Sequence, residues 1–329
     1  MASLLPGLVL CLAVAAAAHV ASPVIPSLPA IVLALIIGMA LNPLAARPAI
    51  QPGLTFAVKT LLRWAIALLG LKIAFSDLVA LGPGILLLTV AAMALTLVGT
   101  IMLARRLGLG PEYGALAGAA NAVCGASATL ATATVVPDYP RKNADVALTV
   151  VLANGISTVV MLAYPLLCRL LGMGDVATAE LLGLTIHDMA QVVGAGYAVS
   201  DPVGNLAVVV KLVRVLLLLP VVLLVGRWFQ AQGSAAGPAK VPLPGFAFAF
   251  IGFAVVNSIL PATPLAESYA LTRGVLNDAA RWAMLMAIAA LGLGTSFADL
   301  ARVGWRHIAV FVAATLLLLG VALVGLRLI

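Results

Sequence analysis

Apolar runs of roughly twenty residues recur along the whole chain, and short links containing polar residues, glycine or proline separate them. A helix needs about 20 apolar residues to cross the hydrocarbon core of a bilayer, whereas β-barrel strands would alternate with a period of two. The pattern predicts an all-α polytopic membrane protein with about 11 transmembrane helices. The expected spans are residues 5–20, 27–42, 60–76, 83–104, 112–136, 145–168, 180–198, 205–227, 244–262, 278–297 and 305–327.

The composition excludes several classes of protein. Of the 329 residues, 64% are hydrophobic and 9% are charged, whereas a soluble domain carries about 25% charged residues. Three cysteines are too few for a disulfide scaffold. The three histidines lie far apart and no CxxC motif is present, so we expect no metal and no cofactor. We expect that the protein is not an enzyme, because a membrane enzyme that acts on lipids would need a carboxylate-metal cluster, and the acidic residues do not form one in the sequence.

Positive charge indicates topology. The net charge of +7 comes from basic residues scattered through the links, without the basic stripe that would favour a nucleic-acid partner. Counted over the predicted links, ten Lys and Arg fall on one side of the membrane and five on the other. The richer side is expected to face the cytoplasm, which gives a cytoplasmic N-terminus and an external C-terminus. The first run lacks the positive start of a signal peptide, so we expect it to be retained.

One internal repeat is visible. Residues 65–82 align without gaps to residues 287–304 with 10 identities in 18, including a phenylalanine, an aspartate and two glycines. Six predicted crossings separate the copies, so they would lie in opposite orientations, as in many secondary transporters. The alternative is that two apolar helices converged on a similar composition. We predict one transmembrane domain over residues 1–329, with repeat-related segments at about 60–104 and 278–327 and core motifs at about 112–136 and 180–227.

A stretch of small residues stands out at 118–129, which reads Gly-Ala-Ala-Asn-Ala-Val-Cys-Gly-Ala-Ser-Ala-Thr. Glycine weakens a helix by about 1 kcal/mol relative to alanine, and small residues let backbones approach closely. One interpretation is a helix interrupted near mid-membrane, whose free N–H groups and positive end favour an anion. The alternative is a continuous, tightly packed helix. The candidate binding residues are Asn121, Cys124, Gly125, Ala126 and Ser127, with the cysteine as a small apolar filler rather than a nucleophile.

A second polar cluster contains His187, Asp188 and Gln191. In a helix, His187, Gln191 and Gly194 would share one face, with the aspartate on the adjacent face. The cluster is then a titratable, hydrogen-bonding part of a binding site. The alternative is that it lies at the membrane surface, where a His-Asp pair is simply solvated.

Two cations lie deep in an apolar run. Lys211 and Arg214 stand within 208–219, three residues apart and therefore on one helical face. A basic residue near mid-membrane costs about 2.5–3.5 kcal/mol on insertion scales, so we expect a carboxylate, a polar cavity or an anionic ligand to compensate it. Asp188 alone cannot neutralise both, which favours an anion; an internal ion pair that braces the bundle is the alternative.

Together these motifs resemble the YeiH-type family of sulfate exporters. The resemblance rests on residues 124–128, 186–192, 211–220 and 282–296, which come in family order across roughly 30–325. It implies an inner-membrane carrier of the group that includes bile-acid and sodium–proton transporters, with crossing, discontinuous helices in a core domain that moves against a second domain. Sulfate or a sulfonate-derived anion is the implied cargo. Asp188 stands where glutamate is common, and Asn121-Ala122-Val123 replaces an expected Gly-Thr-Ser/Ala-Ile, which leaves substrate size and shape open.

We therefore predict a secondary transporter that exports a small oxyanion by alternating access. Lys211 and Arg214 would supply charge, half-helix N–H groups around 124–127 would bind the oxygens, and His187 with Asp188 would respond to protons. The alternatives are a Na⁺- or H⁺-coupled organic-anion symporter and an anion channel. The expected partners are a small anionic substrate, a coupling H⁺ or Na⁺ and the lipid bilayer, with a homodimer left open.

Overall fold

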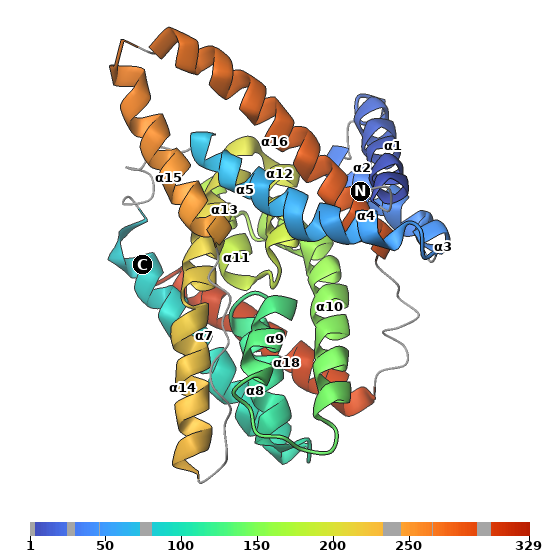
Figure 1. The fold of residues 1–329 in the computed structure, drawn as a ribbon. Helices are drawn as coiled ribbons and strands as arrows, with labels where there is room; N and C mark the ends of the chain where they lie inside the picture. The colour runs from blue at the N-terminus through green and yellow to red at the C-terminus, as the bar shows by residue number, and fades with distance from the viewer. Residues whose placement is uncertain are drawn as a thin grey trace. The chain divides into compact units, whose positions relative to one another are not determined.

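The computed structural model describes residues 4–24, 30–45, 47–72, 81–232, 245–264, 266–294 and 304–329. Within these residues every regular element is a helix, which confirms the all-α prediction (Figure 1). In the part of the chain so described, six helices are long and apolar enough to cross a membrane by length and composition. They are Gln51–Lys72, Gly82–Arg106, Lys142–Leu170, Asp201–Ala231, Ala266–Gly294 and Trp305–Gly325.

Four further apolar helices are shorter: Leu5–Ala21, Ala30–Ala40, Met189–Val199 and Phe248–Ala262. A membrane protein with several spans is therefore confirmed. The predicted number of 11 spans is not confirmed, because these four helices have 10–17 residues and a straight crossing takes about 20.

The chain divides into two compact units. Unit 1 comprises Met1–Leu81, Val193–Val208 and Gly245–Ser296, and unit 2 comprises Gly82–Val192, Val209–Pro244 and Phe297–Ile329. The single domain predicted over the whole chain stays a prediction.

Unit 1 contains several helices, most of which pack against α16. The helices are α1 (Leu5–Ala21), α2 (Ala30–Ala40), α3 (Asn42–Ala45), α4 (Gln51–Phe56), α5 (Leu62–Leu69), α15 (Gly245–Ile259) and α16 (Ala266–Gly294). The π-helical turn Ala57–Leu61 joins α4 to α5. A Cβ atom on Gly38 of α2 would lie 2.6 Å from the carbonyl oxygen of Ala289 on α16, so only glycine permits this approach.

The two predicted repeat copies both begin in unit 1, where α5 packs against α16. Residues 73–80 and 295–303, which hold the phenylalanine and aspartate matches, lie outside the described residues. The inverted orientation of the copies stays a prediction.

Unit 2 holds the motifs that the sequence singled out. Its helices are α7 (Gly82–Arg106), α8 (Gly110–Ala122), α9 (Ala126–Ala133), α10 (Lys142–Leu170), α11 (Asp175–Thr185), α14 (Leu218–Ala231) and α18 (Trp305–Gly325). Two more, α12 (Met189–Val199) and α13 (Asp201–Leu216), contribute residues to both units. A Cβ on Gly114 of α8 would lie 2.6 Å from the Cα of Ile101 on α7, so small residues here also serve close packing.

Helices α8 and α9 form a hairpin that returns to the end of unit 2 from which it started (Figure 1). Tyr113, near the start of α8, donates its hydroxyl to the backbone oxygen of His307 at 3.2 Å. Tyr139, which follows α9, donates to Oδ2 of Asp145 at 3.1 Å, and Oδ1 of that carboxylate lies 3.3 Å from the His307 ring. Burial and Asp145 raise the pKa of Tyr139, with smaller contributions from Glu112 and Tyr113. The prediction that residues 112–136 cross the membrane is therefore wrong.

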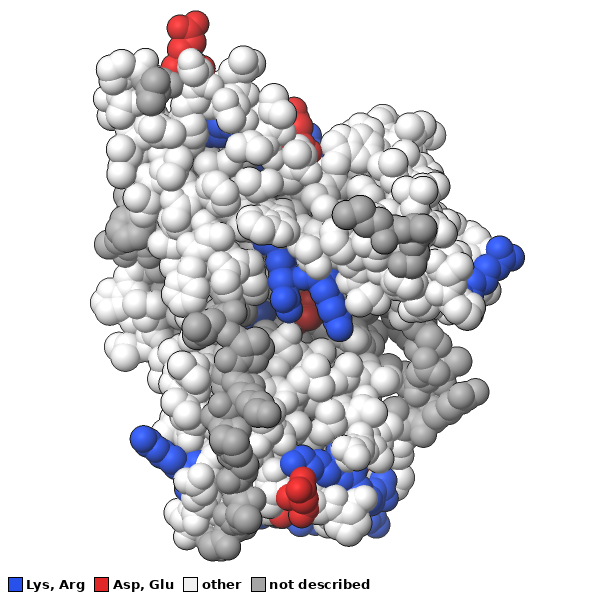
Figure 2. All heavy atoms as spheres, in the orientation of Figure 1, with Lys and Arg blue, Asp and Glu red and all other residues white. Residues whose placement is uncertain are grey.

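This hairpin changes the predicted distribution of basic residues. Arg141 reaches Asp145 at 3.9 Å, beside His307, and Arg306 lies near the loop that precedes α8. The prediction that Arg141 and Arg306 lie on opposite sides is wrong, because the segment between Arg106 and Arg141 turns back instead of crossing. Figure 2 shows Lys and Arg side chains gathered in the lower part of the view, over the ends of α8, α10 and α14.

Candidate functional site

The first feature of the site is a break between α8 and α9. Helix α8 ends at Ala122, and Val123 leaves the helical region with φ −116° and ψ −88°. Gly125 follows with φ 62° and ψ −123°, a conformation that side chains with a Cβ rarely adopt, and α9 begins at Ala126. The interruption predicted from the small residues is confirmed, although it is the tip of a hairpin rather than the middle of a crossing.

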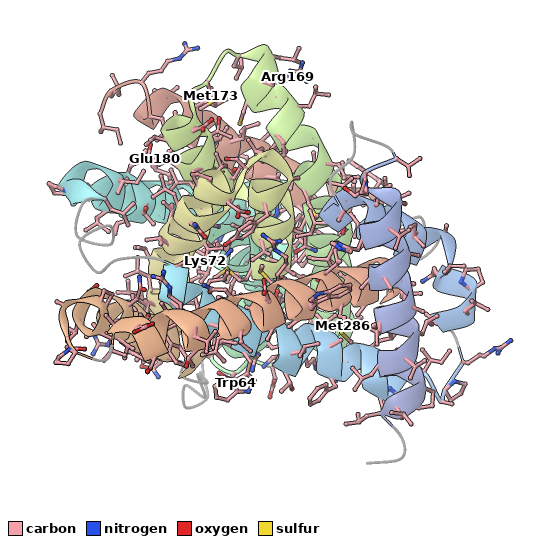
Figure 3. All side chains as sticks on the ribbon, turned by 90° about the horizontal axis from the view of Figure 1, so that it is seen from above. Trp64, Lys72, Arg169, Met173, Glu180 and Met286 are labelled. Carbon is pink, nitrogen blue, oxygen red and sulfur yellow. The ribbon has the colours of Figure 1, made fainter. Side chains whose placement is uncertain are left out.

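A second break separates α11 from α12. Helix α11 ends at Thr185, Ile186 is extended with φ −69° and ψ 136°, and α12 begins at Met189. Figure 3 follows the chain into this part of unit 2, from Arg169 through Met173 to Glu180 on α11. His187 therefore lies in the non-helical link, and its predicted helical face shared with Gln191 and Gly194 is wrong.

The two breaks meet. A Cβ atom on Gly125 would lie 3.9 Å from the Cβ atoms of both His187 and Asp188. These are ordinary contact distances, so the positive φ of Gly125, and not lack of space, favours glycine here. Two helix C-termini, those of α8 and α11, and two helix N-termini, those of α9 and α12, consequently converge on one point of unit 2.

Arg214 binds the two C-terminal ends. Its side chain is 0% exposed, and its guanidinium donates to the last carbonyls of both helices. Nε donates to Ala122 at 2.9 Å, Nη2 to Asn121 at 2.6 Å, and Nη1 to Gly183, Leu184 and Ile186. The planar fork of arginine suits it to bridge two helix ends at once.

Lys211 repeats this arrangement one turn earlier on α13. It is also 0% exposed. Its Nζ donates to the backbone oxygen of Val123 at 2.6 Å and to that of Ile186 at 2.7 Å. Both cations thus lie at helix C-termini, and each C-terminus carries a partial negative charge of about half a unit.

This result changes the interpretation of the two cations. We expected a carboxylate, a cavity or an anion to compensate them, and backbone carbonyls do so instead. The cations alone therefore do not require an anionic ligand. The shared helical face predicted for Lys211 and Arg214 is confirmed, since both donate to Ile186.

The N-terminal ends are held differently. Helix α9 has no side-chain cap on its Gly125 end, Ala126 is half-buried and Ser127 is exposed. At α12, Oδ1 of Asp188 accepts from the backbone N–H of Ala190 at 2.9 Å, and the Asp188 N–H donates to Oγ of Ser157 at 3.3 Å. The positive end of α12 has one acidic cap, and that of α9 has glycine.

His187 joins a hydrogen-bonded group below the breaks. Its Nε2 lies 2.7 Å from Oδ1 of Asn121 and 3.1 Å from Oγ1 of Thr315 on α18. Asn121 Nδ2 donates to Ala117 at 3.0 Å, which identifies Oδ1 as the acceptor and His187 Nε2 as the protonated nitrogen. A further proton on His187 would place a third positive charge beside Lys211 and Arg214, which argues against the predicted proton-responsive role.

Gln191 is the most unusual polar group in the site. It stands at the third position of α12 and is 0% exposed. Within the described residues neither its amide oxygen nor its amide nitrogen has a hydrogen-bond partner, and the same is true of Nδ1 of His187. An unpaired buried amide costs about 1–3 kcal/mol, so such a group indicates a partner supplied from outside the chain.

The ten predicted site residues all lie in unit 2, on or beside the two breaks. Cys124 is buried in the first link as a free thiol. Thr315 and Ser157 complete the group. The sequence gives no signal for Thr315, because one threonine in an apolar run is unremarkable. Among the described residues, no group of three His, Cys, Asp or Glu could hold a metal ion.

The formal charge around the breaks is positive. Lys211 and Arg214 contribute +2 and Asp188 contributes −1, which sums to +1. The partial charges of two helix C-termini and two N-termini cancel in this sum. One monoanion would bring it to zero.

Comparison with known proteins gives a consistent family. A family model described as conserved hypothetical protein 698 matches residues 6–311. The UPF0324 membrane protein TauZ of Paracoccus pantotrophus is 40% identical over 306 residues, covering 91% of this chain and 88% of the relative. The UPF0324 membrane protein RB0971 of Rhizobium meliloti is 38% identical over 324 residues, covering 98% and 92%. A relative from Chlorobaculum tepidum, CT0845, is 36% identical over 316 residues, covering 95% and 86%. No solved structure matches the chain.

Proposed function

The chain belongs to the UPF0324 family of membrane proteins, the family that its motifs resemble, and on that basis we propose that it is a secondary transporter of a small oxyanion. The observation that carries this proposal is the unequal treatment of helix ends at the two breaks. The chain's own cations cap both negative ends, while the positive end of α9 is left without a side-chain cap. Backbone N–H groups at a helix N-terminus are a ready anion site.

Gln191 supports the same site independently. Its buried amide can donate to one oxygen of an anion through Nε2, and it has no partner within the described residues. The N–H groups of Ala126 and Ser127 would bind further oxygens. Ser127 is exposed, so its hydroxyl is available to the ligand.

The charge balance favours an anion over a cation as cargo. Lys211, Arg214 and Asp188 sum to +1, so a metal ion or organic cation would add to an existing excess, whereas a monoanionic oxyanion removes it. Asp188 limits the excess and would repel a second negative charge. A sulfonate therefore fits more easily than a doubly charged sulfate.

Alternating access is the mechanism that this arrangement supports. Interrupted helices place their ends, instead of continuous hydrogen-bonded turns, at the binding point, as in many secondary transporters. We propose that the basic end of unit 2, with Arg106, Arg141 and Arg306, faces the cytoplasm. Helix α18 begins at that end, which would place the C-terminus outside, in agreement with the orientation predicted from the links.

Counterflow in proteoliposomes tests this function. Purified protein in vesicles preloaded with unlabelled anion should accumulate labelled anion transiently, because a carrier exchanges one for the other. The panel should contain sulfate, sulfite, thiosulfate, phosphate and small sulfonates, and the name TauZ of two relatives is a reason to include taurine. Flux that never saturates and shows no counterflow would indicate a channel instead.

Replacement of ions in the same vesicles separates the remaining alternative. A Na⁺- or H⁺-coupled symporter would lose accumulation when the sodium or proton gradient is removed. A uniporter or an anion exchanger would not. Absence of flux for every anion in the panel would contradict the proposed function.

A further inference from the structure

A second buried polar cluster lies in unit 2, apart from the two breaks. It consists of Asp145 in the first turn of α10, His307 in the first turn of α18, Tyr113 at the start of α8 and Tyr139 between α9 and α10. The carboxylate of Asp145 is 5% exposed and the imidazole of His307 is 6% exposed. The proposed anion site makes no use of them.

The contacts in this cluster join four separate segments. Nε2 of His307 lies 3.3 Å from Oδ1 of Asp145, and the hydroxyl of Tyr139 donates to Oδ2 at 3.1 Å. Tyr113 donates to the backbone oxygen of His307 and also packs its ring edge-on against the imidazole, with 4.6 Å between the centroids. Both ends of the α8–α9 hairpin are thereby attached to one Asp-His pair.

Among the residues that the structure describes, few other charges face the pair. Arg141 approaches Oδ1 of Asp145 at 3.9 Å with a largely exposed side chain, and Glu112 contributes to the field at Tyr139. Arg306 precedes His307 on α18. A histidine beside a carboxylate is in general a group that can bind a proton and form an ion pair.

We propose that Asp145 and His307 form a proton-binding site that fixes the two ends of the α8–α9 hairpin when occupied. The proton comes from water at the basic end of unit 2 and binds Nδ1 of His307, because Nε2 already carries the hydrogen directed at Asp145. The imidazolium and the carboxylate then attract each other across 3.3 Å in a poorly solvated site. Loss of the proton leaves a hydrogen bond and loosens the attachment.

The hairpin connects this proton site to the breaks, since Asn121 and Gly125 lie at its tip. An anion bound at the N-terminus of α9 would therefore change the proton affinity of the pair, and by linkage a proton would change the anion affinity by the same factor. This coupling rests on the proposed anion transport. The proton site itself does not.

Hydrogen exchange of residues 110–145 in purified protein tests the proton site without any anion. After correction for intrinsic exchange, protection of the hairpin should increase several-fold as the pH falls from about 8 to 5. His307→Gln keeps a side-chain N–H that can donate to Asp145 but does not titrate, and it should abolish this pH dependence. Asp145→Asn should abolish it as well. The matched control is His19→Gln, whose ring lies against Trp282 in unit 1 and which should behave like the wild type.

Equal pH dependence in the wild type and in His307→Gln would overturn the proton site. The coupling is tested separately, with a pH-indicator dye in weakly buffered solution during addition of sulfate or taurine. The wild type should take up or release protons on binding, and His307→Gln should bind without doing so. If His307→Gln took up or released as many protons on anion binding as the wild type, the coupling would be overturned. Absence of anion binding in the wild type would refute the proposed function, while the exchange data still decide the proton site.

Discussion

The two negative helix ends at the breaks and the positive end of α9 differ in whether a side chain of the chain itself caps them. The C-terminal ends of α8 and α11 are closed by the chain itself, through seven hydrogen bonds from Lys211 and Arg214 to backbone carbonyls. The N-terminal end of α9 begins with a glycine that offers no cap and leads to an exposed serine. The two kinds of end are adjacent: the chain caps both negative ends, whereas among the positive ends α12 has the Asp188 cap and α9 has no side-chain cap.

Lys211 and Arg214 show that a cation deep in an apolar run does not by itself indicate a bound anion. A charged side chain in a membrane segment is costly, which suggests a ligand of opposite charge. Here the helix ends themselves are that opposite charge, so the cations stabilise the breaks. The indication of a ligand moves to the opposite ends, where the Gly125 end of α9 has no side-chain cap and the Gln191 amide has no partner within the described residues.

The largest expected effect concerns Arg214. Arg214→Ala leaves five buried carbonyl oxygens without this donor and should destabilise the protein by about 3–5 kcal/mol, as for other buried charges that lose a partner. Arg214→Lys should retain part of that stability, because an ammonium has three donors and cannot replace all five hydrogen bonds that the guanidinium makes. Thermal unfolding of both variants in detergent measures this. Unfolding of Arg214→Ala at the wild-type temperature would show that the negative ends need no cap.

The next effect concerns Gly125. Gly125→Ala meets no clash, since the nearest atom to the new Cβ is 3.6 Å away, but it forces alanine to φ 62° and ψ −123°. We expect a loss of about 1–3 kcal/mol in stability together with weaker anion binding. Gly172→Ala, in the link after α10 with φ 64°, is the matched control. It should lose stability and keep anion binding; equal loss of binding in both variants would argue against a site at α9.

Gln191 separates binding from stability most clearly. Gln191→Leu removes a buried amide without a partner, so the ligand-free protein should be as stable as the wild type or more so, by up to about 1 kcal/mol. Anion affinity should fall about tenfold, as for one lost hydrogen bond to a charged group. Thr96→Val on α7 removes another unpaired buried polar atom and should leave affinity unchanged. A less stable Gln191→Leu with normal affinity would show that the amide serves the fold alone.

The smallest effect concerns Ser127 in the first turn of α9. Ser127→Ala removes one exposed hydroxyl and leaves the backbone N–H groups in place, so affinity should fall only a few-fold and stability should not change. Titration followed by the unfolding temperature measures both quantities. If Ser127→Ala bound the anion with unchanged affinity, the hydroxyl would not be a ligand, and the backbone N–H groups and Gln191 would form the site without it.

Much of the fold was predictable, because length and hydrophobicity of the runs identify helices in lipid. The break after Ala122 was also predictable, since glycine and other small residues concentrate there. The hairpin was not. Residues 112–136 are as long and apolar as a crossing, and only the contacts of Tyr113 and Tyr139 with the starts of α18 and α10 show that the chain turns back.

The residues of the site were predictable from the sequence, but the roles of several of them were not. Lys211 and Arg214 are conspicuous because charge is rare in such runs. Their partners are backbone carbonyls that belong to residues of any type, so no sequence pattern indicates them. His187 was placed on a helix because 3.6-residue periodicity continues through it, whereas the extended Ile186 ends α11 one residue earlier.

Thermal unfolding of the purified wild type in a series of sodium salts at one ionic strength tests the central claim most directly. Anion binding stabilises by RT ln(1 + [L]/Kd), about 2.7 kcal/mol at a hundredfold excess over Kd. The unfolding temperature should rise with one class of oxyanion and not with chloride, and Gln191→Leu should reduce that rise. Identical unfolding temperatures in every salt would contradict an anion site at the open helix ends.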